Sequence, residues 1–560
     1  MMRNLIIVIL LFIGSVSAQT YTPATGNLFI PDSMMLGTSA NSTWIEAITA
    51  GSIVVKVEGT ELIMDGNPHD FSPPASFDTA KFYVDATLGS DANSGSNADT
   101  AWQTITHIEQ YATSPGFDPG DTIYFRRGEV WGMDSVWQIL SSGDATGNVV
   151  YDGDSWGAGA KATIRATGTG GVSGIGFSIV RIVDVRYVTF QNFIVDGDNQ
   201  VGKWGIMVGG NVDTQGQPEQ NDEHHITIQD NEIENIGDTD SYNNAITLRC
   251  DEDTISDVTI LRNHIHDVSS HGITVYATAM QYGGDSNATT QNTYIGYNTL
   301  TDFHLALGEA GSGIMITRQS DSTVIEYNSI INSAANFCLV IMPHNESGTS
   351  MVTQNVTIRY NYIKNYGGGF AALYFSPDNG ITEALFYNIY GNLIWADGVG
   401  TTSTRAVYFQ MRGTCDYTGS IINFYNNTVI STYYAALEET MNGTFNIRNN
   451  ILYNIGTISF LRAMYSSVGT LTHSNNLYFS NHSGDFISVD GTGYDATEIP
   501  GWEATAEVTD PTFTVEFSNL NLQAGSDAID GGVAVAGYTT DYDGVAVGSP
   551  PNIGAKETTE

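Results

Sequence analysis

The segment ITIQDNEIENIG at residues 226–237 returns in altered form as VTILRNHIHDVS at 258–269 and VTIRYNYIKNYG at 356–367. Each copy has a short run of alternating β-branched and polar residues, then Asn, any residue and an apolar residue. Ten units of this kind lie between about 188 and 480, and such a recurrence indicates a solenoid. Equivalent Asn amides in successive coils can donate to and accept from one another, and Asn tolerates left-handed backbone. We therefore expect a parallel β-helix with a stacked Asn ladder at Asn192, Asn231, Asn263, Asn298, Asn328, Asn361, Asn392, Asn427, Asn450 and Asn476.

A second strand follows the Asn in most units, as in AITLRCD (245–251), GITVYAT (272–278), GIMITRQ (313–319) and ALYFSPD (372–378). Side chains alternate along a strand, so the second and fourth residues are predicted to face the core. The third and fifth residues are predicted to face outward. The predicted inward residues are Ile246, Leu248, Ile273, Val275, Ile314, Ile316, Leu373, Phe375, Val407 and Phe409.

The composition excludes several other classes of protein. The 560 residues include 61 acidic and 20 basic side chains, for a formal net charge of −41. This balance provides no basic face for binding nucleic acid. The hydrophobic share of 41% and the aromatic share of 11% argue against disorder. Glycine is frequent but shows no every-third-residue period, which excludes collagen.

The first eighteen residues, MMRNLIIVILLFIGSVSA, have the pattern of a cleavable secretory signal. We expect a secreted protein, extracellular or periplasmic, with no membrane span after cleavage; an uncleaved anchor is the alternative. Cys250, Cys338 and Cys415 lie in strand-like runs and do not form a disulfide framework, so we expect three buried free thiols.

Two flanking segments resemble a known family. The segments FYVDATLGSDANSGSNADTAWQTITHIEQYA (82–112) and GDTIYFRRGEVW (120–131) are similar to the opening of secreted right-handed parallel β-helix proteins of the pectate-lyase-like superfamily. The tail at 525–557 resembles the usual ending of that family, from which Asn552 and Lys556 depart. The matching residues are Tyr83, Val84, Asp85, Gly89, Asp91, Asn93, Gly95, Trp102, Thr104, Ile105, Gly120, Asp121 and Gly128.

The resemblance implies an all-β, right-handed parallel β-helix over 81–557. It has an N-terminal cap with a short helix at about 82–131 and a C-terminal cap at about 485–557. Residues 19–80 are predicted to form a small β segment and linker. The resemblance also implies a carbohydrate-active protein, but it does not fix the chemistry, because this scaffold hosts lyases, hydrolases, esterases, epimerases and binding proteins.

The outward positions of the second strands are the first candidate site. Tyrosine rings can stack on sugars, and arginine can hold a uronate carboxylate or a sulfate through two hydrogen bonds. The alternative is that arginine is common on solvated β surfaces. The predicted substrate-binding residues are Tyr276, Arg318, His344, Tyr374, Tyr408 and Arg412.

The densest group of ionisable residues is NHIHDVSSHG at 263–272. By register, Glu232 and Glu234 of the preceding coil are predicted to lie beside His264 and His266. A carboxylate next to an imidazole raises its pKa and can position it as an acid or a base. The alternatives are an ordinary turn of a β-helix coil or, less favoured, a metal site. The predicted catalytic residues are Arg249, His266, Asp267 and His271.

Acidic residues also gather in two connections one coil apart. Hard oxygen ligands of this kind suit Ca²⁺, and several lyases of the resembled superfamily use such an ion. Solvated acidic loops are the alternative. The predicted metal ligands are Asp222, Glu223, Asp251 and Asp253.

These features favour a secreted monomer that acts on an extracellular polysaccharide. A lyase that cleaves an acidic glycan by β-elimination is the preferred function. A glycoside hydrolase would need two carboxylates at a set separation, and Asp251, Asp267 and Asp378 are conceivable partners. A non-catalytic glycan-binding or structural protein is the third alternative, since a tyrosine stripe alone would suffice for it.

Overall fold

The computed structural model describes four strands before residue 66 and most of the chain from residue 79 to residue 557. Within the latter range it leaves out 168–177, 201–203, 211–222, 238–242, 252–253, 278–287, 304–310, 333–336, 347–348, 366–369, 377–380, 382, 398–403, 411–414, 433, 455–461, 467–468 and 516–518. The predicted signal segment therefore lies outside the described residues. None of the described helices has the length and apolar character that crossing a membrane requires.

The chain divides into two compact units, Met1–Ser76 and Phe77–Glu560. The first unit contains an antiparallel sheet in which each strand pairs with the next along the chain. Its strands are β1 (Ser33–Leu36), β2 (Thr43–Thr49), β3 (Ser52–Val57) and β4 (Thr60–Asp65).

The second unit begins with a strand, a 3₁₀ helix and an α-helix. The Thr104 side chain accepts a hydrogen bond from the backbone N–H of His107 and so starts helix α2 (Ile105–Thr113). The helix buries Ile105, Ile108 and Ala112, and the Trp102 ring stacks on Phe82 of the first strand at 5.1 Å. A short 3₁₀ helix, η1 (Ala98–Thr100), precedes it. Aromatic packing thus covers the first coil and closes this end of the core.

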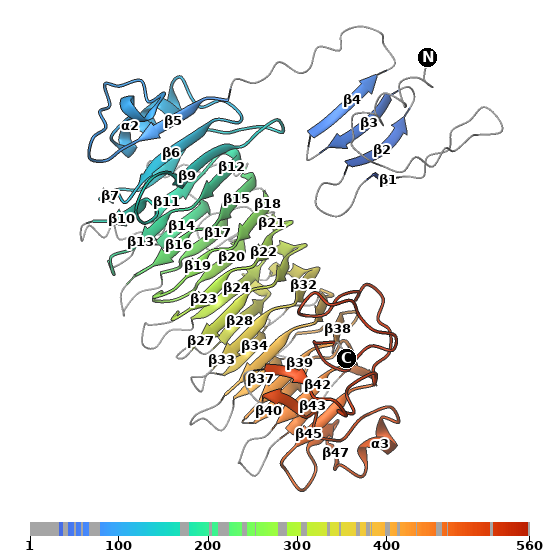
Figure 1. Cartoon of the computed structure of the whole chain (residues 1–560). Helices are drawn as coiled ribbons and strands as arrows, with labels where there is room; N and C mark the ends of the chain where they lie inside the picture. The colour runs from blue at the N-terminus through green and yellow to red at the C-terminus, as the bar shows by residue number, and fades with distance from the viewer. Residues whose placement is uncertain are drawn as a thin grey trace, which may run out of the picture. The chain divides into compact units, whose positions relative to one another are not determined.

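Three parallel sheets run along the second unit, and each full coil contributes one strand to each sheet in turn (Figure 1). The sixteen-stranded sheet contains β5 (Lys81–Val84), β6 (Thr122–Arg127), β9 (Val149–Gly157), β12 (Arg186–Gln191), β15 (His224–Gln229), β18 (Thr254–Leu261), β21 (Thr289–Gln291), β22 (Tyr294–Gly296), β25 (Ser320–Asp321), β26 (Val324–Glu326), β31 (Thr353–Gln354), β32 (Val356–Arg359), β35 (Phe386–Tyr390), β38 (Ile421–Tyr425), β41 (Thr444–Arg448) and β44 (Thr470–Ser474).

The twelve-stranded sheet follows the Asn turn. It contains β7 (Val130–Met133), β10 (Thr163–Ala166), β13 (Ile194–Asp196), β16 (Glu232–Glu234), β19 (His264–Ile265), β23 (Thr299–Thr301), β27 (Ser329–Asn332), β33 (Tyr362–Asn365), β36 (Leu393–Ala396), β39 (Thr428–Ser431), β42 (Ile451–Asn454) and β45 (Leu477–Ser480).

The thirteen-stranded sheet completes each coil. It contains β8 (Trp137–Ile139), β11 (Ser178–Ile182), β14 (Trp204–Gly209), β17 (Ile246–Cys250), β20 (Ile273–Ala277), β24 (Ser312–Arg318), β28 (Phe337–Met342), β34 (Ala371–Phe375), β37 (Arg405–Phe409), β40 (Ala435–Glu439), β43 (Arg462–Ser466), β46 (Ile487–Val489) and β47 (Thr492–Tyr494). Apart from β47, which pairs antiparallel with β46, the strands of these sheets stack in parallel, and this confirms the predicted β-helix.

The predicted core alternation is also confirmed. All ten residues predicted to face inward on the second strands are at most 1% exposed and belong to one continuous apolar core. Cys250, Cys338 and Cys415 are buried and form no disulfide, as expected. Alternation along each strand therefore sets which side chains enter the core, and stacking of coils makes that core continuous.

The Asn ladder is confirmed from Asn231 to Asn476. In each rung, the Nδ2 and the backbone N–H of one Asn donate to the Oδ1 of the next, as between Asn263 and Asn298 at 3.0 and 2.9 Å. The same Nδ2 also donates to a carbonyl of the preceding coil, at 2.9 Å for the oxygen of Ile228. At the far end, the Glu503 carboxylate accepts from the backbone N–H of Asn476 at 2.8 Å and ends the series.

Two details of the ladder prediction are wrong. Phe193, not Asn192, occupies the first rung position, since its N–H donates to the Asn231 Oδ1 at 3.0 Å. The left-handed residue is also not the ladder Asn. It is the residue before it, such as Arg262 (φ 52°) or Tyr327 (φ 54°). The left-handed residue thus comes one position before the ladder Asn. The ladder Asn can then direct its side-chain amide along the stack of coils.

The C-terminal part folds back on the solenoid (Figure 1). It contains α3 (Ile499–Trp502) and the pair β48 (Phe513–Val515) and β49 (Asn519–Leu522), and a second small hairpin, β29 (His344–Glu346) with β30 (Thr349–Met351), lies earlier in the chain. The Tyr360 hydroxyl donates to the carbonyl of Thr540 at 3.1 Å, and the Tyr538 ring packs against Tyr360, Tyr390 and Tyr425. The tail therefore covers aromatic side chains beside the Asn ladder.

Candidate functional site

Several connections that leave the thirteen-stranded sheet are long, whereas the Asn turn is short in the units that the structure describes. β18 ends at Leu261 and β19 begins at His264, but β14 ends at Gly209 and β15 begins only at His224. Likewise, β20 ends at Ala277 and β21 begins at Thr289. Long connections held on a rigid scaffold are where binding and catalytic groups gather. The outward face of this sheet is therefore the candidate site.

The parallel register brings the predicted cationic and aromatic residues together. Arg249 of β17 pairs with Tyr276 of β20, and Arg318 of β24 pairs with the adjacent Ala277. The guanidinium carbons of Arg249 and Arg318 lie 5.9 and 5.7 Å from the centre of the Tyr276 ring. Tyr276 is partly exposed. We call Arg249, Tyr276, Arg318 and Asp251 the arginine–tyrosine site.

Asp251 is the acidic residue of this site and lies near its arginines. Its Oδ2 accepts a hydrogen bond from the Arg249 Nε at 2.7 Å, and both side chains are almost fully buried. Burial raises the pKa of the Asp251 carboxyl, and the positive charges of Arg249, Arg318 and Arg181 oppose that rise. Breaking a buried pair of this kind costs about 3–5 kcal/mol. Arg249 is thus fixed in place, and Arg318 is the more adaptable cation.

The tyrosines further along the same face differ from the prediction. Tyr374 and Tyr408 do point away from the main core, but they are only 3% and 7% exposed. Their rings pack on each other at 5.7 Å, and Phe370 packs on both. Stacking on a sugar needs an exposed ring face, so the structure favours a packing role for these two residues.

The remaining predicted residues do not form one group. His266 and Asp267 directly follow β19 of the twelve-stranded sheet, whereas Arg249 lies on the thirteen-stranded sheet. The structure therefore does not bring Arg249 together with His266. His271, before β20, is buried, and its Nδ1 accepts from the Ser312 N–H at 3.0 Å, which gives it a structural partner. His344 begins the hairpin strand β29.

The predicted calcium ligands are only partly described. Asp222 and Asp253 lie outside the described residues, as do Arg412 and Asp378. Glu223 is fully buried and its Oε1 accepts from the backbone N–H of Asp184 at 2.9 Å. Asp251 is held by Arg249 in the presence of two further guanidinium groups. These two carboxylates fit a calcium site poorly, because nearby cations repel a second positive charge.

Sequence reasoning missed three charged residues on this sheet. Arg181 of β11 donates to the carbonyl of Gly209 at 3.3 Å and adds positive charge near Asp251. Arg405 pairs with Glu438 and lies 4.7 Å from the centre of the Tyr408 ring. Glu438 is the third residue of ALEETMN (436–442), so the outward-position rule would have identified it.

A second ionisable cluster lies on the twelve-stranded sheet. The predicted register is confirmed, because Glu232 of β16 pairs with His264 of β19. The His266 Nε2 lies 3.4 Å from the Glu232 Oε1 and 3.5 Å from the Glu234 Oε2. Burial, aided by the neighbouring His266, lowers the pKa of His264. Burial alone would also lower the pKa of His266, but hydrogen bonds to Asp267 and Glu232 raise it overall.

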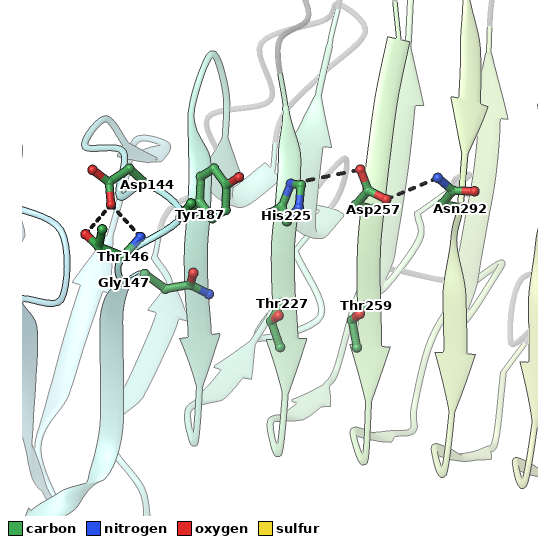
Figure 2. Close-up of a pocket in the computed structure, with 11 residues that line it drawn as sticks. Asp144, Thr146, Gly147, Tyr187, His225, Thr227, Asp257, Thr259 and Asn292 are labelled. Carbon is green, nitrogen blue, oxygen red and sulfur yellow. Dashed lines mark hydrogen bonds and ion pairs between the residues drawn. The ribbon is translucent and has the colours of Figure 1, made fainter. Parts of the chain in front are cut away.

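A shallow pocket of about 510 Å³ lies on the sixteen-stranded sheet and contains none of the predicted site residues. Figure 2 shows Tyr187, His225, Asp257 and Asn292 in a row along successive coils, with Asp144 and Thr146 on the neighbouring turn. The Asn292 Nδ2 donates to Asp257 at 3.1 Å, and His225 stacks on Tyr187 at 4.4 Å. These polar groups largely bond to one another.

Comparisons with known proteins give structural similarity only. No protein-family model matches the chain, and no curated protein matches it. Similar solved structures include a GH136 lacto-N-biosidase from Eubacterium ramulus (14% identity, 73% of this chain and 66% of that chain, TM-score 0.40). Others are XylC in complex with xylose (11%, 86% and 98%, 0.47) and an alginate lyase from Paenibacillus sp. str. FPU-7 (12%, 73% and 96%, 0.36). The chain thus spans slightly less than two thirds of the lacto-N-biosidase.

Proposed function

We propose that this protein is an exported enzyme that cleaves an acidic polysaccharide by β-elimination at the arginine–tyrosine site. The observation that carries the proposal is the placement of Arg249 and Arg318 on the two sides of Tyr276, beside the long connection that follows β20. The chain has only 20 basic residues against 61 acidic ones. The guanidinium groups gathered at this site attract an anionic substrate locally, although the protein as a whole is acidic.

The chemistry follows from the needs of a uronate. Arg318 would bind the carboxylate through two hydrogen bonds and neutralise its charge, which makes the proton on the adjacent ring carbon easier to remove. A base takes that proton, the electron pair forms a carbon–carbon double bond, and the glycosidic oxygen leaves with a proton. Tyr276 is the partly exposed group beside both guanidinium groups, so we assign both proton transfers to its hydroxyl oxygen, which accepts the ring proton and passes its own proton to the leaving glycosidic oxygen.

Two earlier expectations remain part of the proposal. Export rests on the sequence of residues 1–18. A calcium ion would require Asp222 and Asp253 to supply most of the ligands, since Glu223 and Asp251 are engaged elsewhere. No step above depends on that ion.

The test is incubation of the protein with uronic, sulfated and neutral polysaccharides, with and without EDTA. A β-elimination produces an unsaturated uronate, so ultraviolet absorbance should rise together with new reducing ends on a uronic substrate. New reducing ends without absorbance would replace the proposal with hydrolysis. Binding without any product would replace it with a glycan-binding function.

Substitutions at Arg318 and Tyr276 test whether the proposed site is correctly placed. Arg318→Ala should lower kcat/KM by about 10- to 100-fold, the loss expected for one charge-assisted contact. Tyr276→Phe should lower kcat by about 100-fold or more, with KM little changed. The control is Arg262→Ala, because Arg262 is an exposed arginine paired with Asp230 at the Asn turn. If both site variants match the control in activity, the site is misplaced.

A further inference from the structure

We infer that Glu232, His264 and His266 form a binding site for a borderline transition-metal ion such as Zn²⁺, on the outer face of the twelve-stranded sheet. Each of the three residues offers one ligand atom, and these atoms lie within 4.8 Å of one another. This site is on a different sheet from the arginine–tyrosine site and does not depend on the proposed function.

The distances suit a common ion. The Glu232 Oε1 lies 3.4 Å from the His266 Nε2 and 3.9 Å from the His264 Nδ1. Ligands bound to Zn²⁺ at about 2.0–2.2 Å in a tetrahedral site are roughly 3.3–3.6 Å apart. His264 is half exposed, so a small side-chain rotation would bring its nitrogen to that separation.

Asp267 orients the central ligand. The His266 Nδ1 lies 2.7 Å from the Asp267 Oδ2, so it is the nitrogen that carries the proton and donates to the carboxylate. The Nε2 of the same ring is then left to face Glu232 and Glu234. A carboxylate on the far nitrogen of a metal-ligating histidine fixes the tautomer and raises its basicity, which is the usual outer partner of such ligands.

Strand pairing positions the carboxylates and imidazoles of this site without a bound ion. Ile233 and Ile265 are fully buried between the ligand positions and pair with each other across β16 and β19. Because side chains two residues apart share a strand face, Glu232 and Glu234 both point outward beside the imidazoles. The Asn231–Asn263 rung fixes the turn that leads into both strands. Glu234 is therefore available as a fourth ligand at 3.5 Å from His266.

The ligand chemistry selects the class of ion. Two imidazoles with a carboxylate favour Zn²⁺, Cu²⁺, Ni²⁺ or Co²⁺ over Ca²⁺ and Mg²⁺, which take mainly oxygen ligands. The competing state is a protonated His266 paired with Glu232, Glu234 and Asp267. Lys161 adds a positive charge near His264. The carboxylates outnumber that charge, so a divalent cation is electrostatically acceptable here.

The test is calorimetric titration of the full chain, stripped with EDTA and dialysed, with ZnCl₂ and separately with CaCl₂. We expect one tight equivalent of Zn²⁺, no competing Ca²⁺ binding at that site, and a zinc-dependent rise in Tm. His264→Ala and His266→Ala should each remove the tight equivalent. Asp267→Asn should weaken it by about 10- to 100-fold, because it acts only through His266.

The matched control is His225→Ala. His225 also lies next to a second histidine, His224, and 3.9 Å from a carboxylate, that of Asp257, but on the sixteen-stranded sheet. This variant should bind Zn²⁺ as the wild type does. The inference is overturned if the wild type binds no tight Zn²⁺, or if His264→Ala, a change at a half-exposed side chain, binds it unchanged. Loss of the tight equivalent in His225→Ala instead would also overturn it.

Discussion

Asn361 lies in the middle of the ladder, and its replacement by Ala tests how much each rung contributes to stability. Its Oδ1 accepts from the backbone N–H and the Nδ2 of Asn328, both at 3.0 Å. Its Nδ2 donates to the Ile325 carbonyl at 2.8 Å, the Arg359 carbonyl at 2.9 Å and the Asn392 Oδ1 at 3.0 Å. All of these groups lie in the interior of the turn, where water cannot replace the lost side chain.

The magnitude follows from those contacts. Asn361→Ala removes these five contacts, three of which share the two hydrogens of Nδ2, and it leaves the buried N–H of Asn328 without its acceptor. A hydrogen bond contributes about 0.5–1.5 kcal/mol net, and an unsatisfied buried group costs about 1–3 kcal/mol. Some donors keep a second acceptor, as Asn328 Nδ2 does at the Ile295 carbonyl. We therefore expect a loss of about 3–5 kcal/mol in the free energy of unfolding.

The control is Asn423→Ala. Asn423 is also stacked between two coils, with hydrogen bonds of 2.9 Å to Asn388 and Asn446, but it is half-buried on the sixteen-stranded sheet. Water can replace those bonds, so we expect a loss of about 0.5 kcal/mol. Urea denaturation followed by circular dichroism gives the difference, and hydrogen exchange over 323–396 shows whether the affected coils open first. A loss below about 1 kcal/mol for Asn361→Ala, or equal losses for both variants, would refute the reasoning.

Three further predictions concern titratable groups. The pKa of His266 is raised in the folded protein, so its contribution to stability is fully present below about pH 6.5 and is lost as pH rises through that raised pKa. When Tm is measured against pH in EDTA, the wild type should show that loss of stability and His266→Gln should not. Burial raises the pKa of the Cys250 thiol to about 12, so a thiol-specific dye at pH 8 should label Cys250 only after unfolding. Labelling of Cys250 in the native protein would contradict this. Glu503→Ala should lower stability by about 2–4 kcal/mol, because Asn476 and Tyr478 lose a buried acceptor; an unchanged urea midpoint would count against it.

Periodicity in the sequence was enough to predict the fold. Each coil repeats the same Asn spacing and the same alternation of buried residues, such as Ile273 and Val275. When successive coils pair, these buried residues align and form a continuous core. The off-by-one error at Asn192 arose because Phe193, the next residue, fills the position that aligns with Asn231. Sequence letters alone cannot distinguish the two neighbouring positions.

The site was less predictable, for physical reasons. Alternation gives the direction of a side chain but not what covers it, so Tyr374 and Tyr408 were correctly placed outward, yet they pack on each other. β19 is only two residues long, so His266 lies just beyond its end, at a corner of the coil. His266 and Arg249 are close in sequence, but they lie on different sheets and are not brought together. By contrast, the Glu232–His264 pairing follows from register alone and was predicted correctly.

The direction of the Asn ladder has a consequence for how the solenoid ends. Every rung donates toward the C-terminal end, so the last donors would offer a ready template for another coil or another chain. The Glu503 carboxylate accepts from both the backbone N–H and the Nδ2 of Asn476, and it also accepts from the Tyr478 hydroxyl. The last donors of the aligned row of amides are thus already paired within the chain, so this end of the ladder does not offer them to another chain.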